Sequence, residues 1–428
     1  MGAPVFLLPA PGGAAPQSAA PPAVGGRTPD PGPVLARLLV LAVLAVPPAL
    51  AQGTEGAPGG GAADPVVFVH GLSHSDLAWG RVAAALEADG YGRPHAVHAD
   101  LNASEQTDAA SDVVVSEIVP MRRRRDGTPV AVRGGAVGPV ASRLFFVNFR
   151  AVADTVAGVV RPYALRGAGR SESNESGVVK QGAALGVVVR DVLAATGADR
   201  VVLVGQSMGG LAIREYLQRR DSTGRPRWWA EPDAAAGHRV RAAVTYGTPH
   251  QGSDLGAALC DEGGGASLLS ALTEAFAGAR TEAIRDVRAT YPCSALGPGR
   301  YLYGGDEAET DEFESFDVDA DGVVGGAVVG INAGDPATPY ATDNPAMPLP
   351  RDVEYVYVVG SVFGLGTDLV VDVDRQALQG RDETGRPTLV PEGARRVVTG
   401  RPHLQQTADA DTIRRVLRDL GAAPPGAY

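Results

Sequence analysis

Residues 201–211 read Val-Val-Leu-Val-Gly-Gln-Ser-Met-Gly-Gly-Leu, and this stretch decides the fold. Its first four residues have the length and apolar character of a buried strand, and residues 211–219 have helical apolar spacing. A serine between two glycines at such a junction predicts a sharp turn that exposes the Ser207 hydroxyl. The N–H of Met208 is then free to donate to a developing oxyanion. Gly-x-Ser-x-Gly also occurs by chance in glycine-rich chains, but the flanking strand and helix favour a nucleophile over a structural turn.

Apolar runs alternate with helical patterns on both sides of this turn. We expect strands near 65–70, 143–149, 201–204, 240–246 and 353–359, and helices near 77–86, 181–195 and 211–219. This alternation predicts an α/β fold with a mostly parallel sheet covered by helices on both faces. The pattern breaks down at about 251–350, which is rich in Gly, Asp and Pro. We therefore predict one domain over 65–420 that carries a cap or lid insertion in this stretch.

The two ends of the chain are expected to lie outside this domain. Arg37 precedes an apolar run over residues 38–46, and Ala49-Leu50-Ala51 follows. This order is typical of a secretory signal, so residues 1–51 are interpreted as a signal peptide with an N-terminal extension. A membrane anchor is the alternative. Residues 52–64 are expected to be a flexible leader and 421–428 a disordered tail, and the protein is expected to be secreted.

The charge and the cysteines narrow the function further. The net charge of −11 argues against a nucleic-acid binder, which usually needs a basic face. The sequence leaves the oligomeric state open. The only two cysteines are Cys260 and Cys293. In an exported protein they predict one disulfide, with two buried thiols as the alternative.

The catalytic base must come from seven histidines. When a nucleophile turn of this kind carries a triad, the chain order is serine, acid, histidine, so the base must follow Ser207. His238 lies before the next predicted strand and His250 directly after it. His403 lies past every predicted strand and just before the last helical pattern, and we predict that it is the base.

The acid and the second oxyanion donor follow from the same topology. Asp368 lies on the segment after the strand near 353–359, where a carboxylate can hold the histidine tautomer. It is preferred over Asp321, which has no long strand before it; Asp372 and Asp374 are further alternatives. His70-Gly71-Leu72 follows the first strand, so the Leu72 N–H is the predicted second oxyanion donor, with His70 orienting that loop.

Two segments of this chain resemble known lipases. Residues 201–211 are similar to the nucleophile turn of secreted bacterial lipases, and Gly247-Thr248-Pro249-His250-Gln251-Gly252 is similar to a stretch of triacylglycerol lipases and GPI inositol-deacylase-like hydrolases. The resemblance spans about residues 65–405. It implies an α/β-hydrolase fold and ester hydrolysis without an organic cofactor. Ser207 would be the nucleophile, Asp368 the acid and His403 the base, with Leu72 and Met208 as oxyanion donors.

The chain departs from the family at two places. Gln206 stands where histidine is usual, and Leu369 stands where glycine is common. The first departure leaves the chemistry untouched, and the second weakens the assignment of Asp368.

Two patterns in the predicted insertion point to additional features. Asp317, Asp319 and Asp321 alternate before Gly322, as in a calcium loop, but Val328 takes the place of the EF-hand glutamate. A calcium loop of another kind and a solvated acidic turn both remain open. Residues 267–279 place apolar side chains on one helical stripe, which fits either a lid at a lipid interface or an ordinary packing face.

The sequence therefore predicts a secreted serine hydrolase acting on a small-molecule or lipid ester. An acyltransferase with the same triad is one alternative. A non-catalytic, calcium-dependent surface-binding protein with a relict hydrolase fold is another, and the intact motifs count against it.

Overall fold

The computed structural model describes most of the chain between residues 64 and 424. The described residues are 64–72, 74–101, 113–123, 129–131, 140–151, 154–156, 159–161, 177–230, 237–253, 300–306, 318–319, 327–333 and 342–424. The predicted signal segment, both cysteines, the predicted lid helix, Asp317 and Asp321 lie outside them. The disulfide, the lid and the calcium loop stay predictions.

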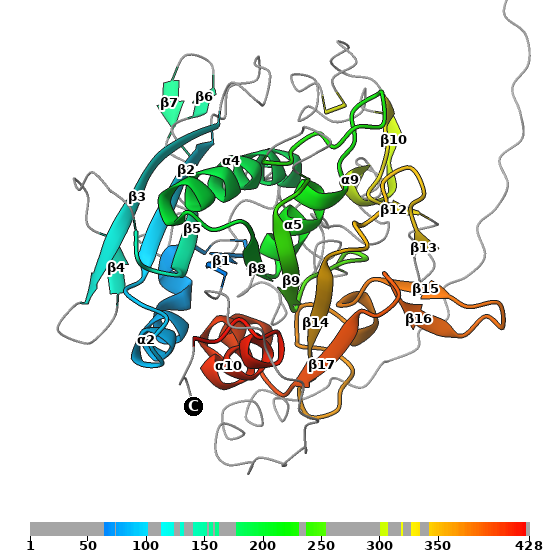
Figure 1. Ribbon diagram of the computed structural model, residues 1–428. Helices are drawn as coiled ribbons and strands as arrows, with labels where there is room; N and C mark the ends of the chain where they lie inside the picture. The colour runs from blue at the N-terminus through cyan, green and yellow to red at the C-terminus, as the bar shows by residue number, and fades with distance from the viewer. Residues whose placement is uncertain are drawn as a thin grey trace, which may run out of the picture. The chain divides into compact units, whose positions relative to one another are not determined.

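Within the described residues, a sheet of nine strands forms the centre of the domain (Figure 1). Its order is β17-β14-β9-β8-β1-β5-β2-β3-β4. The strands are β1 (Val66–Val69), β2 (His95–Leu101), β3 (Val113–Arg123), β4 (Pro129–Ala131), β5 (Leu144–Ala151), β8 (Val201–Gln206), β9 (Val240–Tyr246), β14 (Glu354–Gly360) and β17 (Arg395–Thr399). All neighbours pair in parallel except β2 with β3 and β3 with β4. The predicted mostly parallel sheet is confirmed.

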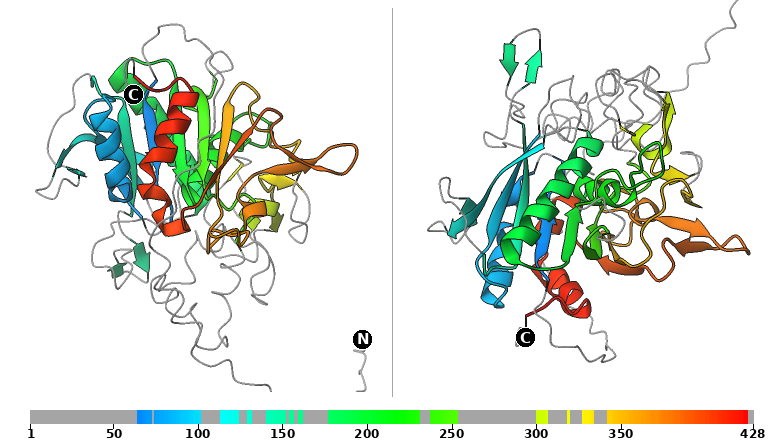
Figure 2. Two further views of the ribbon diagram at one scale, coloured as in Figure 1. Left: turned by 90° about the horizontal axis from the view of Figure 1, so that it is seen from below. Right: turned by 45° about the horizontal axis from the view of Figure 1, so that its top comes forward.

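Helices cover both faces of this sheet (Figure 2). One face packs against α4 (Val178–Thr196) and α5 (Met208–Gln218), and the other against α2 (Gly80–Ala88) and α10 (Ala410–Asp419). In β8, Val201 and Leu203 point to the first core and Val202 and Val204 to the second, as strand alternation requires. Because both faces are buried, the strand is a continuous apolar run. None of the described helices is long and apolar enough to cross a membrane.

Short elements extend from the sheet in the region predicted as an insertion and after β14. They are α9 (Arg300–Tyr303), β10 (Gly305–Asp306), β11 (Ala327–Val328), β12 (Asn332–Ala333), β13 (Thr342–Asp343), η3 (Val373–Arg375), β15 (Gln379–Arg381) and β16 (Pro387–Leu389). A separate hairpin joins β6 (Asp154–Val156) to β7 (Val159–Arg161). The buried Arg214 of α5 connects β12 with the segment after β9. Its Nη2 donates to Asn332 Oδ1 at 2.7 Å, and its Nη1 donates to the His250 carbonyl at 3.0 Å.

The packed domain extends further toward the C-terminus than the sequence predicts. Ala422 is fully buried, and its N–H donates to the Leu417 carbonyl at 2.8 Å. The prediction of a disordered tail over residues 421–428 is therefore wrong for its first residues, which include Ala422. Ala422, just past α10, packs into the core between α2 and α10. A single alanine is too small to stand out in the sequence as a buried position.

A buried ion pair lies at the C-terminal end of α5, between Glu215 and the cap residue Arg219. Glu215 and Arg219 have fully buried side chains, and Arg219 Nε donates to Glu215 Oε1 at 2.7 Å. Arg219 Nη2 donates to Oε2 at 3.0 Å, and the Trp228 indole N–H donates to Oε1 at 2.8 Å. This geometry is bidentate, so the carboxylate loses two charge-assisted donors if the arginine is removed.

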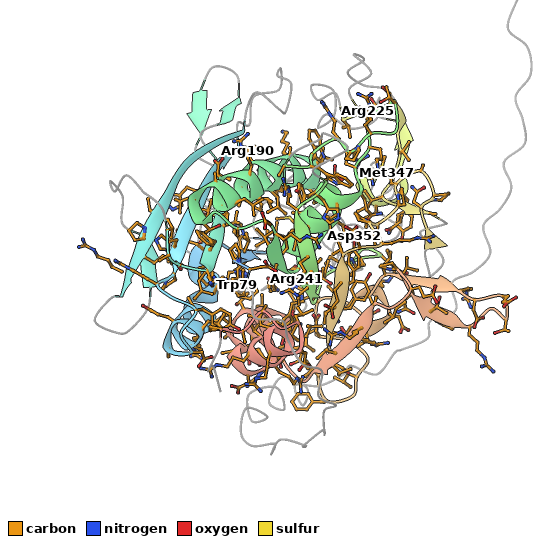
Figure 3. All side chains as sticks on the ribbon, in the orientation of Figure 1. Trp79, Arg190, Arg225, Arg241, Met347 and Asp352 are labelled. Atoms are coloured by element: carbon orange, nitrogen blue, oxygen red, sulfur yellow. The ribbon has the colours of Figure 1, made fainter. Side chains whose placement is uncertain are left out.

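We expect Arg219→Met to lower the free energy of unfolding by about 3 kcal/mol or more, because it leaves a buried carboxylate without its cation. Denaturant titration measures this loss. The matched control is Arg190→Met on the outer side of α4 (Figure 3), where the ion pair with Asp191 is exposed and the expected change is below about 0.5 kcal/mol. Equal effects of the two substitutions would contradict the prediction.

Candidate active site

Ser207 lies on a strained turn between β8 and α5. Its φ of 53° and ψ of −126° are rare for a residue with a side chain. The strand ends at Gln206 and the helix begins at Met208, so the Ser207 hydroxyl stands at the carboxyl end of the sheet. The Ser207 N–H donates to the Tyr246 carbonyl at 2.8 Å, which anchors the turn to the neighbouring strand β9. Strain of this kind collects at functional sites.

Close approach of backbones explains the two glycines that flank the serine. A Cβ at Gly205 would lie 2.6 Å from the Gly209 carbonyl carbon. A Cβ at Gly209 would lie 2.5 Å from the Val69 carbonyl oxygen at the end of β1. The start of α5 therefore lies directly against the end of β1, where the loop bearing Leu72 begins.

His403 joins Ser207 to Asp368 through its two ring nitrogens. His403 Nε2 lies 2.9 Å from Ser207 Oγ, and Nδ1 lies 2.7 Å from Asp368 Oδ2. A carboxylate can only accept, so Nδ1 carries the proton and Nε2 is free to accept from the serine hydroxyl. The His403 N–H also donates to the Asp368 carbonyl at 3.0 Å, which holds the two loops together. The structure joins the three predicted residues by two consecutive hydrogen bonds, an arrangement that can support nucleophilic catalysis.

The Asp368 carboxylate is fully buried and surrounded by donors. Its Oδ1 accepts from the N–H groups of Val370 at 3.0 Å and Val371 at 2.8 Å. Its Oδ2 accepts from His403 and from Gln406 Nε2 at 2.8 Å. The alternatives Asp372 and Asp374 are exposed, and Asp321 lies outside the described residues. The serine turn after β8, the parallel sheet and the order Ser207, Asp368, His403 confirm the α/β-hydrolase fold.

The two predicted oxyanion donors flank the serine. Met208 is the first residue of α5, so its N–H has no acceptor within the helix. The loop that carries Leu72 passes beside the serine, since a Cβ at Gly71 would lie 2.8 Å from Ser207 Cβ. The segments that carry the N–H groups of Leu72 and Met208 therefore both lie next to Ser207. Donation by these two groups to an oxyanion stays a prediction.

His70 orients the loop that leads to Leu72. It is fully buried; its Nδ1 donates to the Gly71 carbonyl at 2.8 Å, and its Nε2 accepts from the Phe149 N–H at 3.1 Å. This pair of contacts requires the neutral ring. Burial lowers the pKa of His70 to about 4, so it stays neutral at ordinary pH.

The other two histidines after Ser207 are engaged elsewhere. His238 Nε2 lies 3.0 Å from Asp352 Oδ1, and its Nδ1 accepts from the Val240 N–H at 2.9 Å. His250 Nε2 lies 2.8 Å from Thr245 Oγ1, and burial lowers the pKa of His250 well below its usual value. Neither has a described contact with Ser207.

Sequence reasoning missed two glutamines that support the acid. Gln406 donates to Asp368, and Gln376 accepts from the Gly360 N–H at 2.6 Å and donates to the Val371 carbonyl at 2.7 Å. Gln376 thereby fixes the loop that carries the acid to the end of β14. Gln406 could have been found from its spacing, since it follows His403 by three residues within a short helix. Nothing in the sequence pointed to Gln376.

The predicted calcium ligands are described only in part. The Asp319 carbonyl accepts from the Ser222 N–H at 2.7 Å, and Asp317 and Asp321 lie outside the described residues. Among the described residues there is no cluster of three or more His, Cys, Asp or Glu side chains that could hold a metal ion.

Comparison with known proteins gives the following. No family model and no curated protein matches the chain. A Listeria innocua gene product is 12% identical with a TM-score of 0.39, over 83% of this chain and 92% of the other. The mature Bacillus licheniformis lipase BlEst2 is 15% identical with a TM-score of 0.38, over 86% and 96%. EstA from Clostridium botulinum is 12% identical with a TM-score of 0.33, over 88% and 92%. These values are too low to bear on the chemistry of this chain.

The His70 ring makes folding sensitive to acid. Between pH 6.5 and about pH 4 the unfolded chain protonates this ring while the folded chain does not, so stability is complete above this window and is lost as pH falls through it. We expect His70→Gln to reduce the fall in unfolding free energy across the window by up to about 3 kcal/mol. Denaturant titrations at several pH values measure the slopes, and identical slopes for wild type and variant would refute the assignment.

Proposed function

We propose that this protein is a serine hydrolase that cleaves carboxylic esters through an acyl-enzyme. The observation that carries the proposal is the contact of His403 with Ser207 Oγ at 2.9 Å and with Asp368 Oδ2 at 2.7 Å. A base within hydrogen-bond distance of a nucleophile, and itself oriented by a carboxylate, is the arrangement that acyl transfer requires.

Each step of the reaction has a residue to perform it. Ser207 Oγ attacks the ester carbonyl carbon while His403 Nε2 takes its proton, and Asp368 stabilises the imidazolium that forms. The N–H groups of Leu72 and Met208 hold the oxyanion. The tetrahedral intermediate expels the alcohol, which takes the proton from His403. Water then attacks the acyl-enzyme with the same proton transfers, which releases the acid and restores Ser207.

The surface beside the triad favours an apolar acyl chain or a lipid ester. Four exposed apolar residues, which we term the apolar rim, lie on the loop of the acid or next to the base: Phe363 at 70%, Leu365 at 66%, Leu369 at 51% and Leu404 at 54% exposure. Phe363 and Leu369 have φ values of 51° and 81°, a conformation that costs a bulky residue energy. Core packing does not account for these exposed side chains, and their place on the acid loop and beside the base supports contact with an apolar substrate.

The first test removes the nucleophile and the acid. We expect Ser207→Ala to abolish hydrolysis of p-nitrophenyl esters and covalent labelling by a fluorophosphonate probe, with a rate loss of up to about a million-fold. Asp368→Asn should lose about ten-thousand-fold, because asparagine favours the wrong His403 tautomer.

The matched control is Asp372→Asn, an exposed aspartate on the same loop, which should keep near wild-type rates. Ser207→Ala protein that keeps more than a few per cent of the activity would overturn the proposal. Transfer of the acyl group to an added alcohol in place of water would instead identify an acyltransferase.

The second test addresses the lipid substrate with the apolar rim. Leu404→Ser should lower the rate on an emulsified long-chain triglyceride about fivefold, since it removes about 1 kcal/mol of apolar burial against the substrate. Hydrolysis of a soluble butyrate ester should not change. Val398→Ser, at an equally exposed apolar residue on edge strand β17, is the control. Best activity of the wild type on acetate or butyrate esters, with no effect of Leu404→Ser, would exclude a lipid substrate.

A further inference from the structure

Gln406 is a fully buried side chain that the mechanism above does not use. Its Nε2 donates to Asp368 Oδ2 at 2.8 Å. The same oxygen accepts from His403 Nδ1 at 2.7 Å. The amide therefore acts on the carboxylate oxygen that holds the base.

The local helix places this amide beside the histidine. His403 and Gln406 lie in η4 (His403–Ala408), a 3-10 helix. In a 3-10 helix the side chains of residues i and i+3 eclipse one another, so both leave the same side of the backbone. Both can thus reach one carboxylate oxygen, which an α-helix at the same spacing would align less closely.

Two strand ends leave room for the amide. A Cβ at Gly360, the last residue of β14, would lie 2.5 Å from Gln406 Nε2. A Cβ at Gly247, just after β9, would lie 2.0 Å from Gln406 Oε1. Close approach to the amide thus explains Gly247, the first residue of the Gly-Thr-Pro-His segment. A side chain at either glycine would collide with the Gln406 amide.

The Asp368 carboxylate is fully buried, so its oxygens need hydrogen-bond donors from the protein. Two backbone N–H groups hold Oδ1, and two side chains hold Oδ2. His403 loses and gains protons during the reaction, whereas the Gln406 amide stays a donor at every pH. His74, on the loop after β1, interacts electrostatically with His403, and burial lowers the pKa of His74.

We propose that Gln406 is a positioning residue of this triad. Its amide holds the Asp368 Oδ2 directed at His403 Nδ1 and shares that oxygen with the histidine. The proposal rests on the proposed function of Ser207, Asp368 and His403.

The main test is Gln406→Met, which keeps the volume and removes the donor. We expect kcat to fall about tenfold, the size of one lost charge-assisted hydrogen bond, with KM unchanged because Gln406 does not reach the substrate. The acid limb of the kcat/KM profile should move to higher pH, because a carboxylate with one donor fewer binds the imidazolium more tightly. The control is Gln218→Met, at an equally buried glutamine of α5 that donates to the Ile331 and Met347 carbonyls. It should lower stability without moving the limb.

Gln406→Glu is the isosteric variant, in case the methionine disturbs folding. Its carboxyl must share protons with Asp368, so the pH profile should gain an ionisation that the wild type lacks. An NMR titration of the histidine rings needs no substrate and should give a raised His403 pKa in Gln406→Met but not in Gln218→Met.

These readouts separate the two proposals. Wild-type protein that neither hydrolyses esters nor reacts with a fluorophosphonate at Ser207 would remove the proposed function, while the NMR titration would still test the contact. Activity profiles of both Gln406 variants that superimpose on wild type, with an unchanged His403 titration, would overturn the positioning role.

Discussion

The buried carboxylate of Asp368 is the constraint on which the site depends, because its charge must be satisfied within the protein. Donors reach it from the acid loop after β14 and from His403 and Gln406 of η4, which follows β17. Parallel strands end at one edge, so the loops after β8, β14 and β17 meet there. The apolar strands buried on both faces hold these three ends in fixed register, and the line from Asp368 through His403 to Ser207 results from that register.

Backbone strain is concentrated at this same edge of the sheet, in the residues of the candidate site and its acid loop. Ser207, Phe363 and Leu369 take left-handed backbone conformations that cost a residue with a side chain energy. The buried contacts around them compensate. Gln376 holds the acid loop to Gly360, and the fully packed strands fix the turn at the serine.

The sequence predicted the elements whose signal is local. Central strands such as β8 are unbroken apolar runs, and the Ser207 turn has glycines wherever backbones touch. It missed β2, where His98 and Asp100 interrupt the apolar run, and edge strand β17, which is half exposed. Gln406 was missed for another reason. Its role depends on the contact between η4 and the loop of Asp368, and the sequence of either segment alone does not reveal that contact. The Cys260–Cys293 bridge, the lid and the carboxylates Asp317 and Asp321 stay predictions.

The central claim is that Ser207 carries the acyl group between two half-reactions. Mass spectrometry of protein quenched during turnover of a p-nitrophenyl ester tests it most directly. The account predicts a mass increase equal to the acyl group, located on the peptide that contains Ser207 and absent from Ser207→Ala. Turnover with no adduct under conditions in which deacylation limits the rate, or an adduct on another residue, would contradict it.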